Sequence, residues 1–247
     1  MTEHRFRQAA VALVAMVVMA AASMAGSDTA NAAGGAGAAQ ANANPRVIPN
    51  QGRLYGDLAA LWWLWAYSFS AADVPFLQGS GAVDLSAGQE GHIWFLAGSN
   101  VGPVIRSAVV PTGVQLFLPM ANLVNDYPCP DPNFKPDPGE SLEHFLTRTA
   151  LPYLDLMTGL FATVDGVALR NLTVYEATSS IFTFTADPAL AATVDPCITG
   201  TAQPGVATGF WLLLTPLPPG DHVVHFGSTG WGQDVTYQLK VEPGKGH

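Results

Sequence analysis

Basic residues are scarce in this 247-residue sequence. Its 10 Lys and Arg residues stand against 19 Asp and Glu residues, which gives a net charge of −9, and no stretch concentrates the basic ones. Nucleic acids and anionic lipids are bound through concentrated positive charge, so the sequence argues against both as partners. Charged residues make up only 12% of the chain, whereas hydrophobic residues make up 49%. A disordered chain has the opposite balance, so we expect a folded protein.

Several catalytic motifs are also absent. The sequence has no Gly-x-Ser-x-Gly elbow, no His-Glu-x-x-His pair and no glycine-rich loop that leads from a strand into a helix. These motifs position a nucleophilic serine, a catalytic zinc ion and a nucleotide phosphate, respectively. Their absence argues against a serine hydrolase of the elbow type, a zinc protease of the zincin type and a nucleotide-dependent enzyme.

The first 32 residues are typical of a signal peptide for export. A positively charged start is followed by an apolar run over residues 9–22, and Ala30-Asn31-Ala32 fits the small-x-small cleavage rule. A membrane span would need a longer apolar run, and no cysteine follows the run to carry a lipid anchor. We therefore expect a secreted, periplasmic or cell-envelope protein, with no integral membrane segment in the mature chain.

Residues 33–45 are rich in Gly, Ala and Asn without periodicity, as in a flexible linker. Residues 46–243 form the expected single β-rich domain, which holds the only two cysteines, Cys129 and Cys197. In an exported chain such a pair predicts a disulfide. Two free thiols, or half of a metal site, would need further cysteine or well-spaced histidine partners, which the sequence lacks.

One long helix is expected over residues 54–69. At about 100° per residue, six apolar side chains fall on one stripe: Leu54, Leu58, Leu61, Trp62, Trp65 and Phe69. Trp63 and Tyr67 lie on the opposite face, four residues apart and therefore adjacent. Such a helix is either sandwiched between two layers or displays its second aromatic pair, and the sequence favours the first arrangement.

Most of the domain has the pattern of short strands separated by turns. The expected strands span residues 91–98, 104–110, 114–119, 160–164, 167–175, 181–185, 207–215, 222–227 and 233–241, with a shorter helix over 140–151. Pro111-Thr112-Gly113 predicts a hairpin between the second and third of these strands, and Asp165-Gly166 predicts another. We expect a mainly β domain, a two-sheet β-sandwich or jelly-roll-like fold, with the long amphipathic helix and the shorter helix packed on it.

Four motifs stand out along the domain: WWxWA at 62–66, GQxGxIWFLAG at 88–98, VPxGxxLFxPxxN at 110–122 and PLxPGxHxxHF at 216–226. With these motifs the chain resembles, over residues 53–241, an uncharacterised family of exported bacterial proteins. The resemblance implies export and a single β-rich domain. It implies no activity, cofactor or catalytic residue, because none is assigned in that family.

Four polar residues are candidates for catalysis: Glu90, His92, Arg106 and His222. Glu90 and His92 stand at the start of an apolar strand, where loops gather functional groups, and Arg106 could face them across a sheet. A buried pair of Arg106 with a carboxylate, used only for structure, is the favoured alternative. Hydrolysis of a glycoside would need two carboxylates about 5–10 Å apart, a spacing that the sequence does not define.

Histidine and acidic residues could also bind a metal. His222 and His225 are three residues apart in an expected strand and so point to opposite faces, which argues against joint ligation of one ion. Metal binding by either of them, with His92 as a further ligand, is the less favoured alternative. The proline-rich loop over 125–140 carries six oxygen donors of the kind that calcium prefers: Asn125, Asp126, Asp131, Asn133, Asp137 and Glu140. Lys135 and Pro136 break the EF-hand pattern. Solvated carboxylates are therefore the favoured interpretation, and calcium is the alternative.

Three aromatic residues are not explained by the core stripe: Trp63, Tyr67 and Trp231. Sugar rings stack on such side chains, whereas a loop Trp231 that closes one end of the sandwich is the competing interpretation. The leading hypothesis is an exported, non-enzymatic binding or surface-associated protein for a carbohydrate or another extracellular ligand. The rival is an extracellular hydrolase or lyase acting on a polysaccharide or a similar substrate. A structural envelope protein without a small ligand is the third hypothesis.

Overall fold

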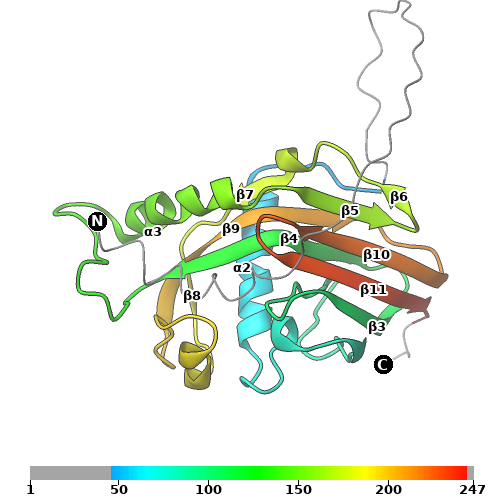
Figure 1. Ribbon diagram of the computed structural model, residues 1–247, viewed down its shortest axis with the longest axis horizontal. Coiled ribbons are helices and arrows are strands. Elements are labelled where there is room, and N and C mark those ends of the chain that lie inside the picture. Colours follow the sequence, from blue (N-terminus) through cyan, green and yellow to red (C-terminus); the bar gives the residue numbers. More distant parts are fainter. Residues whose placement is uncertain (1–45, 244–247) are drawn as a thin grey trace, which may run out of the picture. The chain divides into compact units, whose positions relative to one another are not determined.

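The computed structural model describes residues 46–243, which form two β-sheets and two α-helices (Figure 1). The six-stranded sheet has the order β1 (Gly81–Ala82), β3 (Val104–Pro111), β11 (Gln233–Glu242), β10 (Gly220–Ser228), β5 (Leu160–Val164) and β6 (Val167–Ala168). The five-stranded sheet has the order β2 (Ile93–Phe95), β4 (Gln115–Asp126), β9 (Gln203–Leu214) and β7 (Glu176–Thr178), and β8 (Phe182–Phe184) also pairs with β9. Both sheets are mixed, because β1–β3, β3–β11 and β2–β4 are parallel pairs. The mainly β, two-sheet prediction is confirmed.

The α-helices are α2 (Arg53–Tyr67) and α3 (Leu142–Ala150). Short 3-10 helices are η1 (Pro75–Leu77), η2 (Leu151–Leu156), η3 (Leu172–Tyr175) and η4 (Pro188–Ala192). Within residues 46–243, no helix is long and apolar enough to cross a membrane. The predicted signal peptide and linker, residues 1–45, lie outside the described residues.

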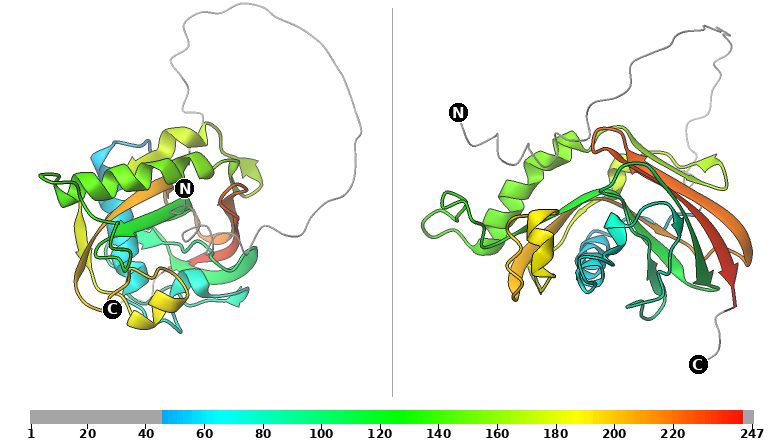
Figure 2. Two further views of the ribbon diagram at one scale, coloured as in Figure 1. Left: turned by 60° about the vertical axis from the view of Figure 1, so that its left-hand side comes forward. Right: turned by 60° about the horizontal axis from the view of Figure 1, so that its bottom comes forward.

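β4 and β9 form the middle of a layered core. Nearly every residue of these strands is buried, because α2 packs on one face of their sheet (Figure 2) and the six-stranded sheet on the other. Trp211 of β9 lies 5.7 Å from Trp62 of α2 between ring centroids. On the opposite face, Leu116 lies against Val110 and Val241 of the six-stranded sheet. A continuous apolar run, rather than alternation, therefore marks the strands that are covered on both sides.

A β-bulge in β4 ties the two sheets together. The register of β4 against β9 shifts between Pro119 and Ala121. Gln233 Nε2 of β11 donates to the carbonyl oxygens of Pro119 and Met120, at 2.6 and 2.9 Å. Gly98 leaves room for this side chain, since a Cβ there would collide with Gln233 Oε1. One buried amide thus satisfies carbonyls that a disrupted ladder would leave unpaired.

α2 is rotated about its axis relative to the predicted stripe. Leu54 and Leu61 of that stripe are 37% and 49% exposed, whereas Trp63 and Tyr67 on the other side are buried. Phe184 of β8 stacks on Tyr67, with 5.0 Å between the ring centroids. The helix contacts β7 and β8 as well as β9. Strands distant in the sequence therefore cover the second aromatic face of the helix, as in the sandwiched arrangement that the sequence favours.

The predicted hairpin over residues 104–119 is wrong. β3 belongs to the six-stranded sheet and β4 to the five-stranded sheet. Both edges of β3 are taken, by β11 on one side and by β1 on the other, so no edge is left for β4.

The Asp165-Gly166 turn is confirmed, because these residues join β5 to β6 with φ angles of 52° and 76°. Positive φ at both positions is what a two-residue turn of this type requires. The strand expected over residues 167–175 is wrong beyond Ala168, since Leu172–Tyr175 is the 3-10 helix η3.

Candidate functional site

The predicted disulfide between Cys129 and Cys197 is present and joins residues 68 positions apart. It lies close to the buried Asp126, whose Oδ2 accepts a hydrogen bond from Gln203 Nε2 at 2.8 Å. Within the described part of the chain, Asp126 and the two cysteines are the one group of three His, Cys, Asp or Glu side chains close enough to share a metal ion. Because the two sulfur atoms are bonded to each other, this group serves as a covalent anchor for the proline-rich loop.

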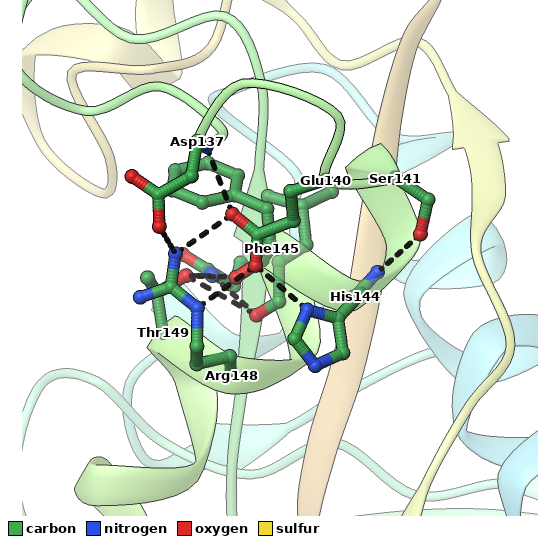
Figure 3. Close-up of polar contacts among 9 residues, drawn as sticks. Asp137, Glu140, Ser141, His144, Phe145, Arg148 and Thr149 are labelled. Atoms are coloured by element: carbon green, nitrogen blue, oxygen red, sulfur yellow. Dashed lines mark hydrogen bonds and ion pairs between the residues drawn. The ribbon is translucent and has the colours of Figure 1, made fainter.

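Glu140 gathers three donors at the end of that loop (Figure 3). Arg148 of α3 donates to both carboxylate oxygens, from Nε to Oε1 at 2.9 Å and from Nη2 to Oε2 at 2.8 Å. His144 Nδ1 lies 2.7 Å from Oε1, and the Asp137 amide donates to Oε2 at 3.0 Å. The Ser141 hydroxyl caps α3 by accepting a hydrogen bond from the His144 amide. The network fixes the loop to the first turns of the helix.

The hydrogen bonds from Arg148, with that of the Asp137 amide next, lower the pKa of Glu140 from 4.5 to about 2. The network therefore stabilises the fold fully above pH 4.5, and this stabilisation is lost as the pH falls toward about 2. Asp131 also accepts a bond from within the loop, from the Asn133 amide at 2.9 Å. These oxygen atoms are directed at donors of the protein rather than at one point, which gives the calcium alternative no support.

The structure does not bring the four catalytic candidates together. Glu90 and His92 are exposed in the loop before β2. Arg106 is buried inside the six-stranded sheet, at 1% exposure, and His222 lies at the start of β10. Within residues 46–243, no hydrogen bond or ion pair joins any two of them, because Arg106 and His222 have separate partners.

Arg106 is surrounded by carbonyl oxygens. Its Nη1 donates to Gly98 O at 2.9 Å and to Tyr237 Oη at 3.1 Å, and its Nη2 donates to Gln78 O. The favoured pairing with a carboxylate is therefore wrong, since no described carboxylate contacts this guanidinium. Burial raises the pKa of Tyr237, and the charge of Arg106 opposes that rise. The guanidinium links two loops to the sheet, which is a structural role.

His222 lies between two hydrogen-bond acceptors. Its Nδ1 is 2.9 Å from Asp165 Oδ2, and its Nε2 is 2.9 Å from Pro218 O. The Val223 amide donates to Asp165 Oδ1 at 3.0 Å. Burial pushes the pKa of Asp165 up, but the bonds from His222 and Val223 outweigh burial, so this pKa lies below its ordinary value. His222 thus belongs to a cluster at the turn between β5 and β6.

The two helical aromatic candidates do not reach the surface. Trp63 and Tyr67 are 6% and 2% exposed, and burial raises the pKa of Tyr67 well above its ordinary value. Their assignment to a sugar-stacking surface is therefore wrong in this structure. Trp231, in the turn between β10 and β11, is half-buried and packs at the rim of the main core. The Trp231 amide donates to Ser228 Oγ at 3.2 Å. Trp231 remains a candidate for ligand binding.

One face of the six-stranded sheet is open to solvent. Exposure alternates along β3 and β11, as in strands with one covered face. The outward apolar residues Ile105, Val109 and Val223 are 56%, 57% and 42% exposed. We call this surface the outer face, and its side chains are Ile105, Val109, Phe161, Thr163, Val223, His225, Asp234, Thr236, Gln238 and Lys240. No described element lies over it.

Phe161, His225 and Asp234 form a cluster at one end of the outer face. His225 Nε2 lies 2.8 Å from Asp234 Oδ1, and the Phe161 and His225 ring centroids are 4.8 Å apart. Gly227 pairs with Phe161 on one side and with Asp234 on the other. A Cβ at Gly227 would collide with the Phe161 ring. The glycine therefore leaves room for the ring to lie against β10.

Two hydroxyl side chains flank this cluster. Thr163 of β5 and Thr236 of β11 pair with His225 in the register, so all three lie on the same face. Among the described residues, none is within hydrogen-bond distance of His225 Nδ1 or of Asp234 Oδ2. Sequence reasoning did not bring these residues together. The pairing of β5 with β10 brings Phe161 to His225, and no local pattern carries that information.

The motifs noted in the sequence have structural roles. The Gln89 side-chain amide donates to Phe95 O and accepts from Phe95 N, both at 2.9 Å, so it fills the edge of β2 as a neighbouring strand would. Trp65 Nε1 donates to Ala87 O at 3.0 Å. Gly88, with φ of 69°, lies close beneath that indole. The chain matches no family model, no curated protein and no solved structure.

Proposed function

We propose that the protein is an exported binding protein that holds a carbohydrate on the outer face, with Phe161, His225 and Asp234 at the centre of the site. The observation that carries this proposal is the cluster itself, an aromatic ring beside a carboxylate and an imidazole on an otherwise uncovered sheet. An aromatic ring offers a platform for the apolar face of a sugar. Polar atoms at its edge bind the hydroxyl groups and so fix orientation.

The chemistry of the outer face favours an uncharged ligand. The Asp234 carboxylate is paired with His225, and Lys240 is paired with Glu242 at the far end of β11. Threonine hydroxyls, a glutamine amide and β-branched apolar side chains make up most of the remaining surface. Such a surface suits a chain with alternating hydroxyl groups and apolar ring faces. We therefore propose a neutral polysaccharide as the ligand class.

The rival hydrolase has less support from the same geometry. Catalysis by two carboxylates would need a second acid close to the first, whereas the side chain that pairs with Asp234 is the imidazole of His225. The four catalytic candidates are distributed between a loop, a buried position of β3 and the start of β10. Arg106 is buried among carbonyls, and so cannot reach a substrate without unfolding of its loops.

Binding of the purified chain to cellulose, chitin and soluble mixed-linkage glucan tests the proposal. We expect retention on at least one of these polymers without release of reducing sugar. Phe161→Ala and Asp234→Asn should each weaken binding about tenfold, since each removes one anchoring contact. Phe182→Ala and Asp57→Asn are matched controls, because Phe182 is half-buried as Phe161 is, and Asp57 of α2 is paired with Arg53 as Asp234 is paired with His225, and neither lies on the outer face. The controls should bind as the unchanged chain does.

Three outcomes would overturn the proposal. The first is the absence of binding to every polymer by a folded chain. The second is equal loss in the variants and in their controls, which would mean that the cluster is not the contact surface. The third is released product, which would restore the hydrolase as the leading function and direct mutagenesis to Glu90 and His92.

A further inference from the structure

Three side chains of the outer face form a row across the strands. β5, β10 and β11 lie side by side, with β10 in the middle (Figure 1). His225 of β10 pairs in the register with Thr163 of β5 on one side and with Thr236 of β11 on the other. Side chains at paired positions point to the same face of a sheet, and all three are half-buried. The row therefore offers a hydroxyl, an imidazole and a second hydroxyl at the surface.

The fold does not use the two hydroxyl groups of this row. Across residues 46–243, no hydrogen bond engages the side chain of Thr163 or Thr236. In the five-stranded sheet, by contrast, the Thr178 and Thr208 hydroxyls are bonded to each other at 2.7 Å. A hydroxyl group both donates and accepts. The Thr163 and Thr236 hydroxyls are therefore available to a ligand on either side of His225.

The row lies beside the aromatic ring of the cluster. Phe161 is two residues before Thr163 on β5, and two residues of a strand span about 7 Å. The Phe161 ring leans toward the row, because its centroid is only 4.8 Å from that of His225. A sugar that stacks on Phe161 therefore has the Thr163 hydroxyl and the His225 imidazole at its edge.

The polar side chains of the outer face define two possible directions for a ligand. One runs along β11, where Gln238 follows Thr236 on the same face. It leads away from Phe161, which is two strands away on β5. The other runs across the strands through His225 and keeps both the ring and the two threonines in reach. A path along β10 is not favoured, because the next outward side chain there is the apolar Val223.

We propose that the polysaccharide crosses the strands along this row, with Thr163 and Thr236 as specificity-determining residues on either side of His225. The inference rests on the proposed function of the outer face and adds the direction of the ligand and the groups that recognise it. Vicinal hydroxyl groups of a sugar each donate and accept, as the threonine hydroxyls do. The two threonines are two strand spacings apart, about 10 Å, which is more than one sugar ring covers. The ligand is therefore a linear neutral polysaccharide that is bound through consecutive sugars rather than through one terminal sugar.

Binding isotherms of four variants test this direction, with whichever of cellulose, chitin and mixed-linkage glucan the unchanged chain retains. Thr163→Val and Thr236→Val each remove one hydroxyl but keep the β-branched shape that strands favour. Each should weaken binding about fivefold, the loss of one hydrogen bond. Gln238→Ala should change the affinity less than twofold, because it lies beyond the row. Thr183→Val is the matched control, since Thr183 is an exposed threonine of β8 in the other sheet, and it should bind as the unchanged chain does.

Competition by soluble sugars gives a second measurement that needs no variant. The trisaccharide of the retained polymer should compete at least tenfold better than its monosaccharide, because only the longer sugar reaches both threonines. Equal competition by the two sugars would overturn the crossing path.

The variants distinguish failure of this inference from failure of the proposed function. Loss of affinity in Gln238→Ala but not in Thr163→Val would overturn the crossing path and leave the binding function standing, with the ligand along β11. Unchanged affinity in both threonine variants, or equal loss in Thr183→Val, would also overturn this inference alone. Retention of none of the three polymers by the unchanged chain would overturn the proposed function, and this inference with it.

Discussion

The core around α2 and the outer face of the six-stranded sheet are both rich in apolar side chains, yet they constrain these side chains very differently. β9 is buried along almost its whole length because it has a layer on each side. β3 alternates between buried and exposed residues because it has a layer on one side only. The same β-branched and aromatic residue types are therefore fixed by packing in one region and free to contact a ligand in the other. We therefore expect changes in the core to alter the stability of the fold and changes on the outer face to alter the proposed binding.

The largest effect should come from the core, through Trp62→Ala. Trp62 is 1% exposed, packs on Trp211 and donates its indole N–H to Leu96 O at 2.9 Å. Its removal leaves a cavity and an unpaired carbonyl, so we expect a loss of about 3–5 kcal/mol in the free energy of unfolding, measured by urea denaturation. Leu61→Ala on the exposed side of the same helix is the control and should cost less than about 1 kcal/mol. Similar losses in the free energy of unfolding for the two variants would show that the Trp62 side of α2 does not carry more of the core than the Leu61 side.

The disulfide should come next. Replacement of Cys129 and Cys197 by serine releases a constraint between positions 68 residues apart. The free energy of unfolding should fall by about 2–4 kcal/mol, the typical contribution of a disulfide, visible as a lower midpoint of thermal unfolding. Reduction of the unchanged chain should reproduce the shift. If the outer face is independent of this region, polysaccharide binding below the midpoint should be unaffected, and a parallel loss of binding would contradict the separation.

A smaller effect is expected at the edge of the five-stranded sheet. Gln89→Ala removes the two hydrogen bonds to Phe95 that replace a neighbouring strand. We expect a loss of about 1–2 kcal/mol, together with concentration-dependent association, because an uncovered strand edge pairs with other chains. Light scattering at increasing protein concentration checks the second part. Gln238→Ala on the outer face is the control and should not associate. Association of the Gln238→Ala variant rather than the Gln89→Ala variant would mean that the edge of β2 is not the site of association.

The amount of this structure that can be predicted from sequence depends on the range of the contacts. The strands expected over residues 114–119 and 207–215 and the Asp165-Gly166 turn are local features, and the structure has strands and a turn at these places, although β4 continues to Asp126 and β9 begins at Gln203. The stripe expected on α2 was wrong at Leu54 and Leu61, which are exposed. That a second layer covers Tyr67 was expected, but not that Phe184 supplies it from a strand more than a hundred residues away in the sequence. The hairpin over residues 104–119 was wrong because β3 finds its partner at the end of the chain.

The candidate site was less predictable than the fold for the same reason. Phe161, His225 and Asp234 are adjacent only through the pairing of β5 with β10 and of β10 with β11. Alternation along one strand tells which residues share a face, but it does not tell which strand lies alongside. The buried Arg106 shows the same limit. Its carbonyl partners belong to loop backbones, which have no signature in the side-chain sequence.

The smallest effect should come from the outer face itself, through Val109→Thr. Val109 is 57% exposed and lies on β3, which pairs with β11, but it pairs there with Lys240, six residues along the strand from Asp234 of the Phe161–His225–Asp234 cluster. Threonine keeps the β-branched shape, so the free energy of unfolding should stay within about 0.5 kcal/mol of the original. Polysaccharide affinity is the sharper measurement. Unchanged affinity would confine the site to the cluster, whereas a clear change would mean that the ligand extends across β11 to β3, so that the whole face, rather than one end of it, is the binding surface.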